Sequence, residues 1–90
     1  MFEILYHNAV KKDIKGISRP DIQRIKTAIE TKLNESPQNY ADRLKGELGD
    51  YWKLRVGDYR AVFKVEKDVI IILGIIHRKE IYKRIIARAV

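Results

Sequence analysis

The sequence contains no cysteine, only two prolines and one tryptophan, and no long hydrophobic run. Without cysteine the chain forms no disulfide and no thiolate metal site, which favours a reducing compartment. The longest apolar run, residues 69–76, is far shorter than the roughly 20 residues that a membrane-spanning helix needs. The first residues also lack the basic segment that precedes the apolar core of a signal peptide. We therefore expect a cytoplasmic protein with no membrane partner.

Residues that bind metals or act as covalent nucleophiles are also scarce. The two histidines, His7 and His77, lie near opposite ends of the chain, and the carboxylates show no metal-ligand spacing. No serine lies in a nucleophile motif, and the chain has no glycine-rich phosphate-binding loop. These absences predict a protein that uses neither a metal nor an organic cofactor.

Positive charge is abundant and unevenly distributed. Nineteen lysines and arginines against twelve aspartates and glutamates give a net charge of +7. Residues 1–42 carry seven basic and six acidic side chains, whereas residues 43–90 carry twelve and six. This asymmetry predicts an anionic partner, with nucleic acid first, an acidic protein second and an anionic membrane surface third. The alternative is a basic surface that serves only solubility.

Ninety residues, of which 46% are apolar, suit one domain over residues 1–90 with a modest core. A strand is expected at residues 2–6, followed by a helix that Asn8 can cap and a second helix that begins at Ser18. Residues 37–50 form a connector, and three strands follow at residues 51–56, 59–65 and 69–77. A short basic helix ends the chain. This order, β-α-α-β-β-β-α, predicts an α+β fold in which two helices cover one face of a mostly antiparallel sheet.

Gly57 and Asp58 separate the first two of these strands and predict a hairpin with a two-residue type II′ turn. The turn sets the register, so alternate residues point to opposite faces. One face is apolar and suits the two helices: Trp52, Leu54, Val56, Tyr59, Ala61, Phe63 and Val65. The other face is cationic and carries Lys53, Arg55, Arg60 and Lys64. The same alternation across the next turn adds to this cationic face Ile71, Leu73, Ile75 and His77.

Arg55 lies opposite Arg60 in this register, and like charges across an antiparallel pair are unfavourable by roughly 0.2–1 kcal/mol. A solvated face on which the arginines splay apart is the simplest explanation. The same face, however, has an apolar floor of Val62, Ile71, Leu73 and Ile75. An apolar floor with a cationic rim is typical of a groove that binds nucleic acid or a partner peptide, and we favour this interpretation.

The cationic residues have the chemistry to cleave RNA, which supplies its own nucleophile, the 2′-OH. Neighbouring arginines disfavour the ammonium form of Lys53, so this lysine can accept a proton. Arg60 and Arg78 can hold the phosphate through bidentate contacts. Tyr82 can orient a base and His77 can move a proton. Tyr82 can equally pack the last helix onto the sheet, and His77 can simply end its strand.

Two stretches, RLKGELGDYWKLRVGDYRAVFKV and IIHRKEIYKRI, resemble the RelE/ParE toxin superfamily, and specifically its RelE-like mRNA endoribonucleases. The resemblance covers essentially the whole chain, and its specificity comes from the combination of LKG, KLRVGDYR and HRKEIY. It implies a toxin of a type II toxin-antitoxin system that enters the ribosomal A site and inhibits translation. Such a toxin cleaves mRNA without metal, by attack of the 2′-OH, and leaves a cyclic phosphate.

The resemblance also implies roles for individual residues. Lys53 matches the proposed general base, and Arg60 matches the arginine that stabilises the phosphate. Arg78 matches the arginine assigned to the transition state or leaving group, and Tyr82 matches the tyrosine that follows it. Tyr51 stands where some active members have a second lysine, which leaves fewer groups for proton transfer.

The implied partners are the ribosome, mRNA and a cognate antitoxin in a heteromeric complex. Basic residues expected to contact RNA or the ribosome are Lys45, Arg55, Lys64, Lys79, Lys83 and Arg84. The antitoxin is expected to mask or displace the C-terminal helix, and the residues expected to contact it are Val62, Ile71, Leu73, Ile75, Ile81 and Ile85.

Two other functions remain open. A ParE-like toxin shares the fold but inhibits DNA gyrase and lacks the catalytic cluster, and the presence here of Lys53, Arg60, Arg78 and Tyr82 argues against it. A non-enzymatic RNA-binding homologue is the third possibility.

Overall fold

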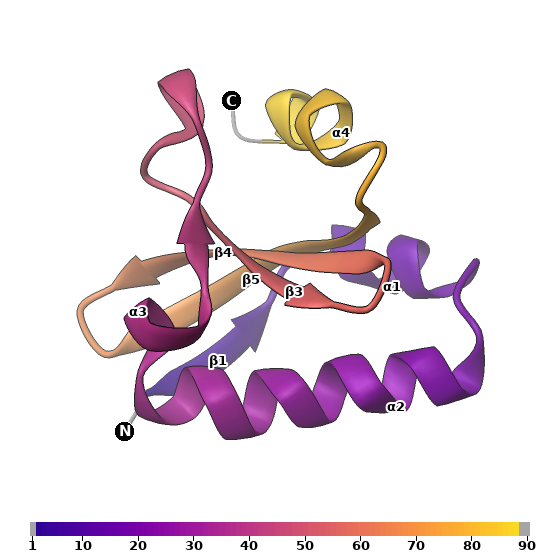
Figure 1. The fold of residues 1–90 in the computed structure, drawn as a ribbon, viewed down its shortest axis with the longest axis horizontal. Coiled ribbons are helices and arrows are strands. Elements are labelled where there is room, and N and C mark those ends of the chain that lie inside the picture. The colour runs from indigo at the N-terminus through magenta and orange to yellow at the C-terminus, as the bar shows by residue number, and fades with distance from the viewer. Residues whose placement is uncertain (1, 89–90) are drawn as a thin grey trace.

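The computed structural model describes residues 2–88, and Figure 1 shows α2 on one side of a five-stranded sheet and α4 on the other. The elements in chain order are β1 (Glu3–Tyr6), α1 (Ala9–Ile14), α2 (Arg19–Ala28), α3 (Pro37–Tyr40), β2 (Asp42–Arg43), β3 (Trp52–Val56), β4 (Tyr59–Glu66), β5 (Val69–His77) and α4 (Ile81–Arg88). The predicted α+β class is confirmed. No helix within residues 2–88 is long and apolar enough to cross a membrane.

The first two helices begin at different kinds of cap. Ser18 caps α2 as predicted, because its Oγ accepts a hydrogen bond from the Asp21 backbone N–H at 3.3 Å. The predicted cap of α1 is wrong. Asn8 makes no side-chain capping bond, and Nδ1 of His7 accepts from the Ala9 N–H at 3.0 Å instead. A histidine therefore satisfies a free donor at the start of α1.

The larger core lies between the sheet and the N-terminal helices. One turn of π-helix, Ile29–Leu33, continues α2 along the sheet. From this helix the side chains of Ile25, Ile29 and Leu33 are almost completely buried. They pack against the apolar face of the strands, whose largest buried side chain is Phe63. The apolar stripe of α2 and the apolar face of the hairpin therefore meet as the sequence predicts.

The sheet order is β1-β5-β4-β3-β2, which places the first strand at an edge and parallel to the last. Strands β3, β4 and β5 pair with one another in an antiparallel manner, as predicted. The segment predicted to be a connector with a possible helical turn, residues 37–50, contains the short helix α3 and also a two-residue strand, β2, which pairs with β3. A strand this short has no alternating pattern to reveal it in the sequence.

The β3–β4 register agrees with the prediction at every pair, from Val56 opposite Tyr59 to Trp52 opposite Phe63. Gly57 has a φ of +60°, which suits the first position of the predicted turn. The alternation predicted for β5 is wrong beyond Ile72, because the register shifts at a β-bulge. Ile72 lies opposite Phe63 and Gly74 lies opposite Val62, which leaves Leu73 as the extra residue.

The bulge moves the second half of β5 to the opposite parity. Ile75 now lies opposite Ala61 and His77 opposite Tyr59, on the face that the N-terminal helices cover. Ile76 takes the predicted position of Ile75, opposite Arg60. The assignment of Ile75 and His77 to the cationic face is therefore wrong, and Leu73 does not continue the alternation. Ile71, before the bulge, lies opposite Lys64 as predicted.

A second, smaller core covers part of the cationic face. Helix α4 lies over this face of the sheet in Figure 1. The segment around residues 44–48 contributes side chains to the same core. The buried side chains of this core are Leu44, Leu48, Val62, Ile76, Ile81 and Ile85. Part of the floor that the sequence suggested as an open groove is therefore filled by the protein's own C-terminal helix.

Candidate functional site

Three arginine side chains gather at the tip of the β3–β4 hairpin. Arg55 and Arg60 are opposite one another in the register. The Nη1 group of Arg60 donates to two carbonyl oxygens of the turn region, at 2.9 and 3.1 Å, so this side chain folds back over the tip. The Arg78 backbone N–H donates to the Asp58 carbonyl oxygen at 2.8 Å, and Arg78 Nε lies 3.8 Å from Asp58 Oδ1. The end of β5 thus brings Arg78 to the hairpin tip.

The electrostatics of the tip favour an anion. Burial lowers the pKa of Arg60, and the charges of Arg55 and Arg78 lower it further, whereas Asp58 opposes this effect. The guanidinium of Arg60 nevertheless stays charged near neutral pH. Asp58 offsets only part of the positive charge of three arginines. A phosphate bound at the tip would relieve the remaining repulsion and accept bidentate hydrogen bonds.

A second group of predicted residues meets beside the hairpin. Tyr82 projects from α4, Lys53 from β3, and Lys45 lies in the segment before the 3₁₀ turn Gly46–Leu48. The Lys45 N–H donates to the Tyr82 hydroxyl oxygen at 3.4 Å, and Lys53 Nζ lies 5.8 Å from the centroid of the Tyr82 ring. Tyr82 is half-buried against the smaller core, so both roles considered for it are compatible with its position. Three segments far apart in the sequence therefore converge on one tyrosine.

His77 does not join this group. Its ring makes an edge contact with Tyr59, with 5.8 Å between the ring centroids, and its Nδ1 accepts from the Lys79 N–H at 3.2 Å. Both contacts belong to the end of β5 and the helix-covered face. The structure therefore favours the interpretation in which His77 ends its strand.

The remaining basic residues differ in solvent exposure and in whether an acidic side chain pairs with them. Lys79, Lys83 and Arg55 are exposed. Lys64 Nζ lies 3.0 Å from Glu66 Oε1, and the hydrogen bond and charge of this glutamate raise the pKa of Lys64. Arg84 Nη2 donates to a buried carboxylate at 2.7 Å and is turned inward. Arg84 is thus already paired with a carboxylate within the chain.

Most of the predicted antitoxin contacts are inaccessible in this conformation. Four of the six are buried: Val62, Ile75, Ile81 and Ile85. Ile71 and Leu73 are half-buried. Exposed apolar side chains lie nearby instead, with Leu5 beside Ile71 in the register and Ile86 on the outer side of α4. A partner reaches the buried residues of the smaller core only if α4 moves.

A family model described as the ParE toxin of type II toxin-antitoxin systems, parDE, matches residues 4–82. The chain belongs to this toxin family. Toxin RelE3 of Methanocaldococcus jannaschii is 33% identical over 84 residues, which cover 89% of this chain and 94% of the relative. The RelE name of this relative agrees with the predicted RelE/ParE superfamily, which is confirmed.

Solved structures of toxin complexes share the fold of this RelE/ParE toxin. The RelB-RelE antitoxin-toxin complex from Methanococcus jannaschii matches with a TM-score of 0.70 and 31% identity, over 89% of this chain and 96% of the other. The RelBE2 complex from Mycobacterium tuberculosis matches with a TM-score of 0.73 and 20% identity, over 86% and 98% of the two chains. The fold is therefore that of RelE toxins.

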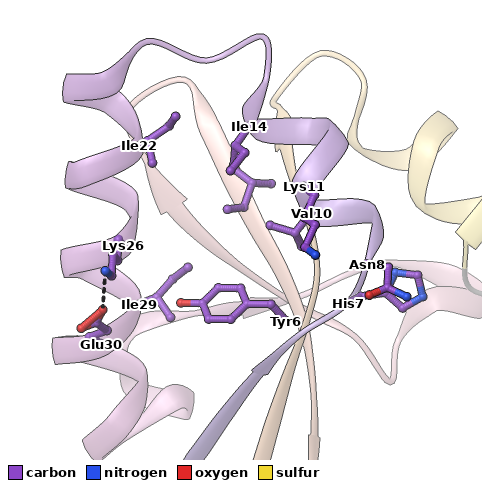
Figure 2. A pocket seen from close by; sticks show the side chains of 11 residues that line it. Tyr6, His7, Asn8, Val10, Lys11, Ile14, Ile22, Lys26, Ile29 and Glu30 are labelled. Carbon is purple, nitrogen blue, oxygen red and sulfur yellow. Dashed lines mark ion pairs between the residues drawn. The ribbon is translucent and has the colours of Figure 1, made fainter.

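The toxin also has an apolar cavity of about 320 Å³ away from the arginine cluster. Figure 2 shows it between α1 and α2, with Ile22 and Ile14 pointing into the space from the two helices and the ring of Tyr6 of β1 extending toward Ile29. Lys26 and Glu30 form an ion pair at its rim. Burial and the charge of Glu30 raise the pKa of Tyr6. The cavity contains none of the residues predicted to bind RNA, so the chemistry of the candidate site does not extend into it.

Within residues 2–88, no three histidine or acidic side chains are grouped to hold a metal ion. One acidic residue that the sequence interpretation overlooked is Asp13 of α1, whose side chain is completely buried. It lies three residues after Val10 and one before Ile14, on the apolar side of a short helix. A carboxylate on the apolar side of a helix indicates that a cationic partner lies nearby, because burying an unpaired charge is strongly unfavourable.

Proposed function

We propose that this toxin is a RelE-like endoribonuclease that cleaves mRNA in the ribosomal A site and inhibits translation. The observation that carries the proposal is the convergence of Arg55, Arg60 and Arg78 at the hairpin tip, beside Lys53 and Tyr82. This arrangement combines groups that bind a phosphate with groups that move a proton. The RelE name of the curated relative supports the same activity.

In the proposed reaction the 2′-OH of the substrate attacks the adjacent phosphorus and the bond from phosphorus to the 5′ oxygen breaks. The 5′ oxygen takes up a proton from solvent as it leaves, so the products are a 2′,3′-cyclic phosphate and a free 5′-OH. Lys53 is the proposed base that accepts the proton from the 2′-OH, while Arg60 and Arg78 stabilise the charge that develops on the phosphate. Tyr82 orients a base by stacking. No metal is required, because the arginines supply the positive charge.

The proposed partner in the cell is a cognate antitoxin of acidic character. The solved relatives from Methanococcus jannaschii and Mycobacterium tuberculosis are antitoxin-toxin complexes. A net charge of +7 favours an acidic partner. The proposed docking surface is the cationic face together with α4, which such a partner either masks or displaces. The site of action is the cytoplasm, where ribosomes and mRNA meet.

Two substitutions test the proposed activity. Arg60→Ala and Arg78→Ala should each abolish growth arrest on induction and lower translation-dependent mRNA cleavage by about 10²–10³-fold, by analogy with removal of one oxyanion donor. Arg19→Ala is the matched control, because it removes an exposed arginine from the first turn of α2. The proposal is wrong if both variants keep their native circular dichroism and remain fully toxic.

The second candidate function is inhibition of DNA gyrase, and the ParE description of the matching family model favours it. Gyrase inhibition does not require Lys53, Arg60 and Tyr82 to lie close together. A supercoiling assay with purified gyrase distinguishes gyrase inhibition from mRNA cleavage. Inhibition by the wild-type protein, together with intact mRNA in a translating extract, would replace the endoribonuclease proposal. Neither inhibition nor cleavage would favour the non-enzymatic RNA-binding homologue.

A further inference from the structure

Asp13 is the most densely bonded side chain among the described residues and lies outside the candidate site. Its Oδ1 accepts from Arg84 Nη2 at 2.7 Å and from Arg88 Nη2 at 2.6 Å. Its Oδ2 accepts from Arg88 Nη1 at 2.8 Å and from the Ile75 backbone N–H at 3.0 Å. Arg88 therefore binds the carboxylate in a bidentate manner, the geometry in which arginine pairs are strongest.

This contact occupies an edge of β5 that no strand covers. β1 pairs with β5 only up to Ile72, so the backbone groups beyond it need other partners. Asp13 accepts from the Ile75 N–H, and Arg88 Nη1 donates to the Leu73 carbonyl oxygen at 3.2 Å. A Cβ on Gly74 would overlap Arg88 Nη1. The edge is thus shaped to receive this one arginine.

Both arginines come from α4, which is otherwise held by its apolar stripe and by the bond from the Lys45 N–H to the Tyr82 hydroxyl. Burial of Ile81 and Ile85 turns one face of α4 to the smaller core, but apolar contacts are non-directional and tolerate small rotations of the helix about its axis. Directional hydrogen bonds to a rigid carboxylate do specify it. Arg84 and Arg88 are four residues apart and lie on one side of α4. Tyr82 of the same helix carries the predicted contact with substrate.

We infer that Asp13 is a positioning residue for the candidate site: its carboxylate holds α4 in the rotation that presents Tyr82 to Lys53. The inference rests on the proposed function for the role of Tyr82 in cleavage. Asp13 itself touches no substrate. Within residues 2–88 the hydrogen-bond donors to its carboxylate are Ile75 of β5 and Arg84 and Arg88 of α4, so its effect on Tyr82 passes through α4.

The test uses Asp13→Asn, which keeps the shape and an acceptor for the Ile75 N–H but removes the charge that pairs two arginines. The expected result is a fall in the kcat of mRNA cleavage of about 10-fold or more, with KM little changed, because small displacements of positioning groups act on kcat. Asp21→Asn is the matched control. It removes a partly exposed carboxylate that lies 3.4 Å from Arg24, and kcat should stay unchanged.

A double-mutant cycle separates positioning from a general structural role. If Asp13 acts through Tyr82, Asp13→Asn should have almost no further effect on kcat in a Tyr82→Ala background. Effects of the two substitutions that multiply independently would overturn the inference. Arg84→Gln combined with Asp13→Asn gives the same comparison for one of the two bonded arginines.

Two readouts do not depend on cleavage and keep this inference distinct from the proposed function. Asp13→Asn should increase amide hydrogen exchange in α4 while β3 and β4 stay protected. It should also shift the Lys53 side-chain NMR signals toward those of Tyr82→Ala, because the ring lies 5.8 Å from Lys53 Nζ. Absence of cleavage by the wild type would remove the proposed function alone. Unchanged α4 exchange and Lys53 signals would overturn the inference about Asp13.

Discussion

The two faces of the sheet bury apolar side chains in different ways. On one face, α2 and its π-helical extension pack directly on the strands through a core centred on Phe63. On the other face, the short helix α4 covers a smaller core, and the cations beside it are exposed at Arg55 and half-buried at Lys53, Arg60 and Lys64. The first face is built for stability. The second combines modest burial with the buried ion-pair network of Asp13, Arg84 and Arg88, and it carries the residues proposed to act on RNA.

The difference separates the side chains that stabilise the fold from those that are proposed to act on RNA. Cations that repel one another are tolerated at the tip of β3–β4 because the opposite side of the same strands supplies the stabilising burial. Substitutions on the two faces should therefore differ in their effects, from a large loss of stability at Phe63 to a small gain at Arg55.

The largest effect should come from Phe63→Ala on the helix-covered face. Phe63 is completely buried and stacks on Trp52 with 6.4 Å between ring centroids. Its truncation should lower the free energy of unfolding by about 3–5 kcal/mol, measured by urea denaturation. Tyr40→Ala, which removes a half-exposed aromatic ring, is the control and should change stability by at most about 0.5 kcal/mol. Equal losses for the two variants would contradict this account of the core.

Ile85→Ala should have a smaller effect, because α4 can detach instead of leaving a cavity under the sheet. Ile85 is completely buried in the smaller core. We expect a loss of about 2 kcal/mol, at the low end for such a truncation. Hydrogen exchange should rise in α4 alone, with α2 unchanged. Ile86→Ala, one residue along on the exposed side, is the matched control. A uniform rise in exchange over the whole chain would show that the two faces unfold as one unit.

Acid should weaken the cationic face through Asp13. Burial raises the pKa of Asp13, but the hydrogen bonds of Arg88 and Ile75 and the charges of Arg88 and Arg84 outweigh burial and lower it. The folded carboxyl therefore binds a proton less tightly than the unfolded one. Its contribution to stability is complete above the unfolded pKa of about 3.8 and is lost as the pH falls through the lower folded pKa.

The measurement is the difference in unfolding free energy between the wild type and Asp13→Asn as a function of pH. This difference should be largest near neutral pH and should shrink below about pH 4. Asp21→Asn, at an exposed pair, should show a small difference throughout. A difference for Asp13→Asn that does not change with pH would mean that its charge does not stabilise the fold.

The smallest effect should come from Arg55→Gln at the hairpin tip. Removing one of two opposed cations should raise the free energy of unfolding by roughly 0.2–1 kcal/mol. The same substitution should weaken binding to single-stranded RNA and reduce the slope of log K against log salt by about 0.7, the value for one lost phosphate contact. Lys15→Gln, at an exposed position after α1, should change neither quantity. A loss of stability in Arg55→Gln would show that the arginines do not repel one another.

Much of the fold follows from local sequence signals. The two-residue turn at Gly57 and Asp58 fixes the register of β3 and β4, and with it the face that carries Lys53, Arg55 and Arg60. Ser18 marks the start of α2 through a local hydrogen bond. These features depend on residues close in sequence, so they could be predicted. Arg78 and Tyr82 were added to this group from their chemistry and from the family resemblance, because no local turn signal places them beside the hairpin.

Features that depend on distant contacts could not be predicted in this way. The bulge at Leu73 reverses the faces of Ile75 and His77, and no turn signal in the sequence marks it. The edge position of β1 depends on pairing with a strand more than sixty residues away. The burial of Ile81 and Ile85 depends on where α4 docks, which an amphipathic pattern alone does not specify.

The class of fold, the register of the hairpin and the one-sided placement of positive charge follow from the sequence alone, because turn chemistry and alternation act over a few residues. Long-range packing, in contrast, is needed for α4 to fill the floor beside those charges and for Asp13 to hold α4 there. The physical reason is that a buried carboxylate is stable only with its partners in place, and here those partners come from the other end of the chain.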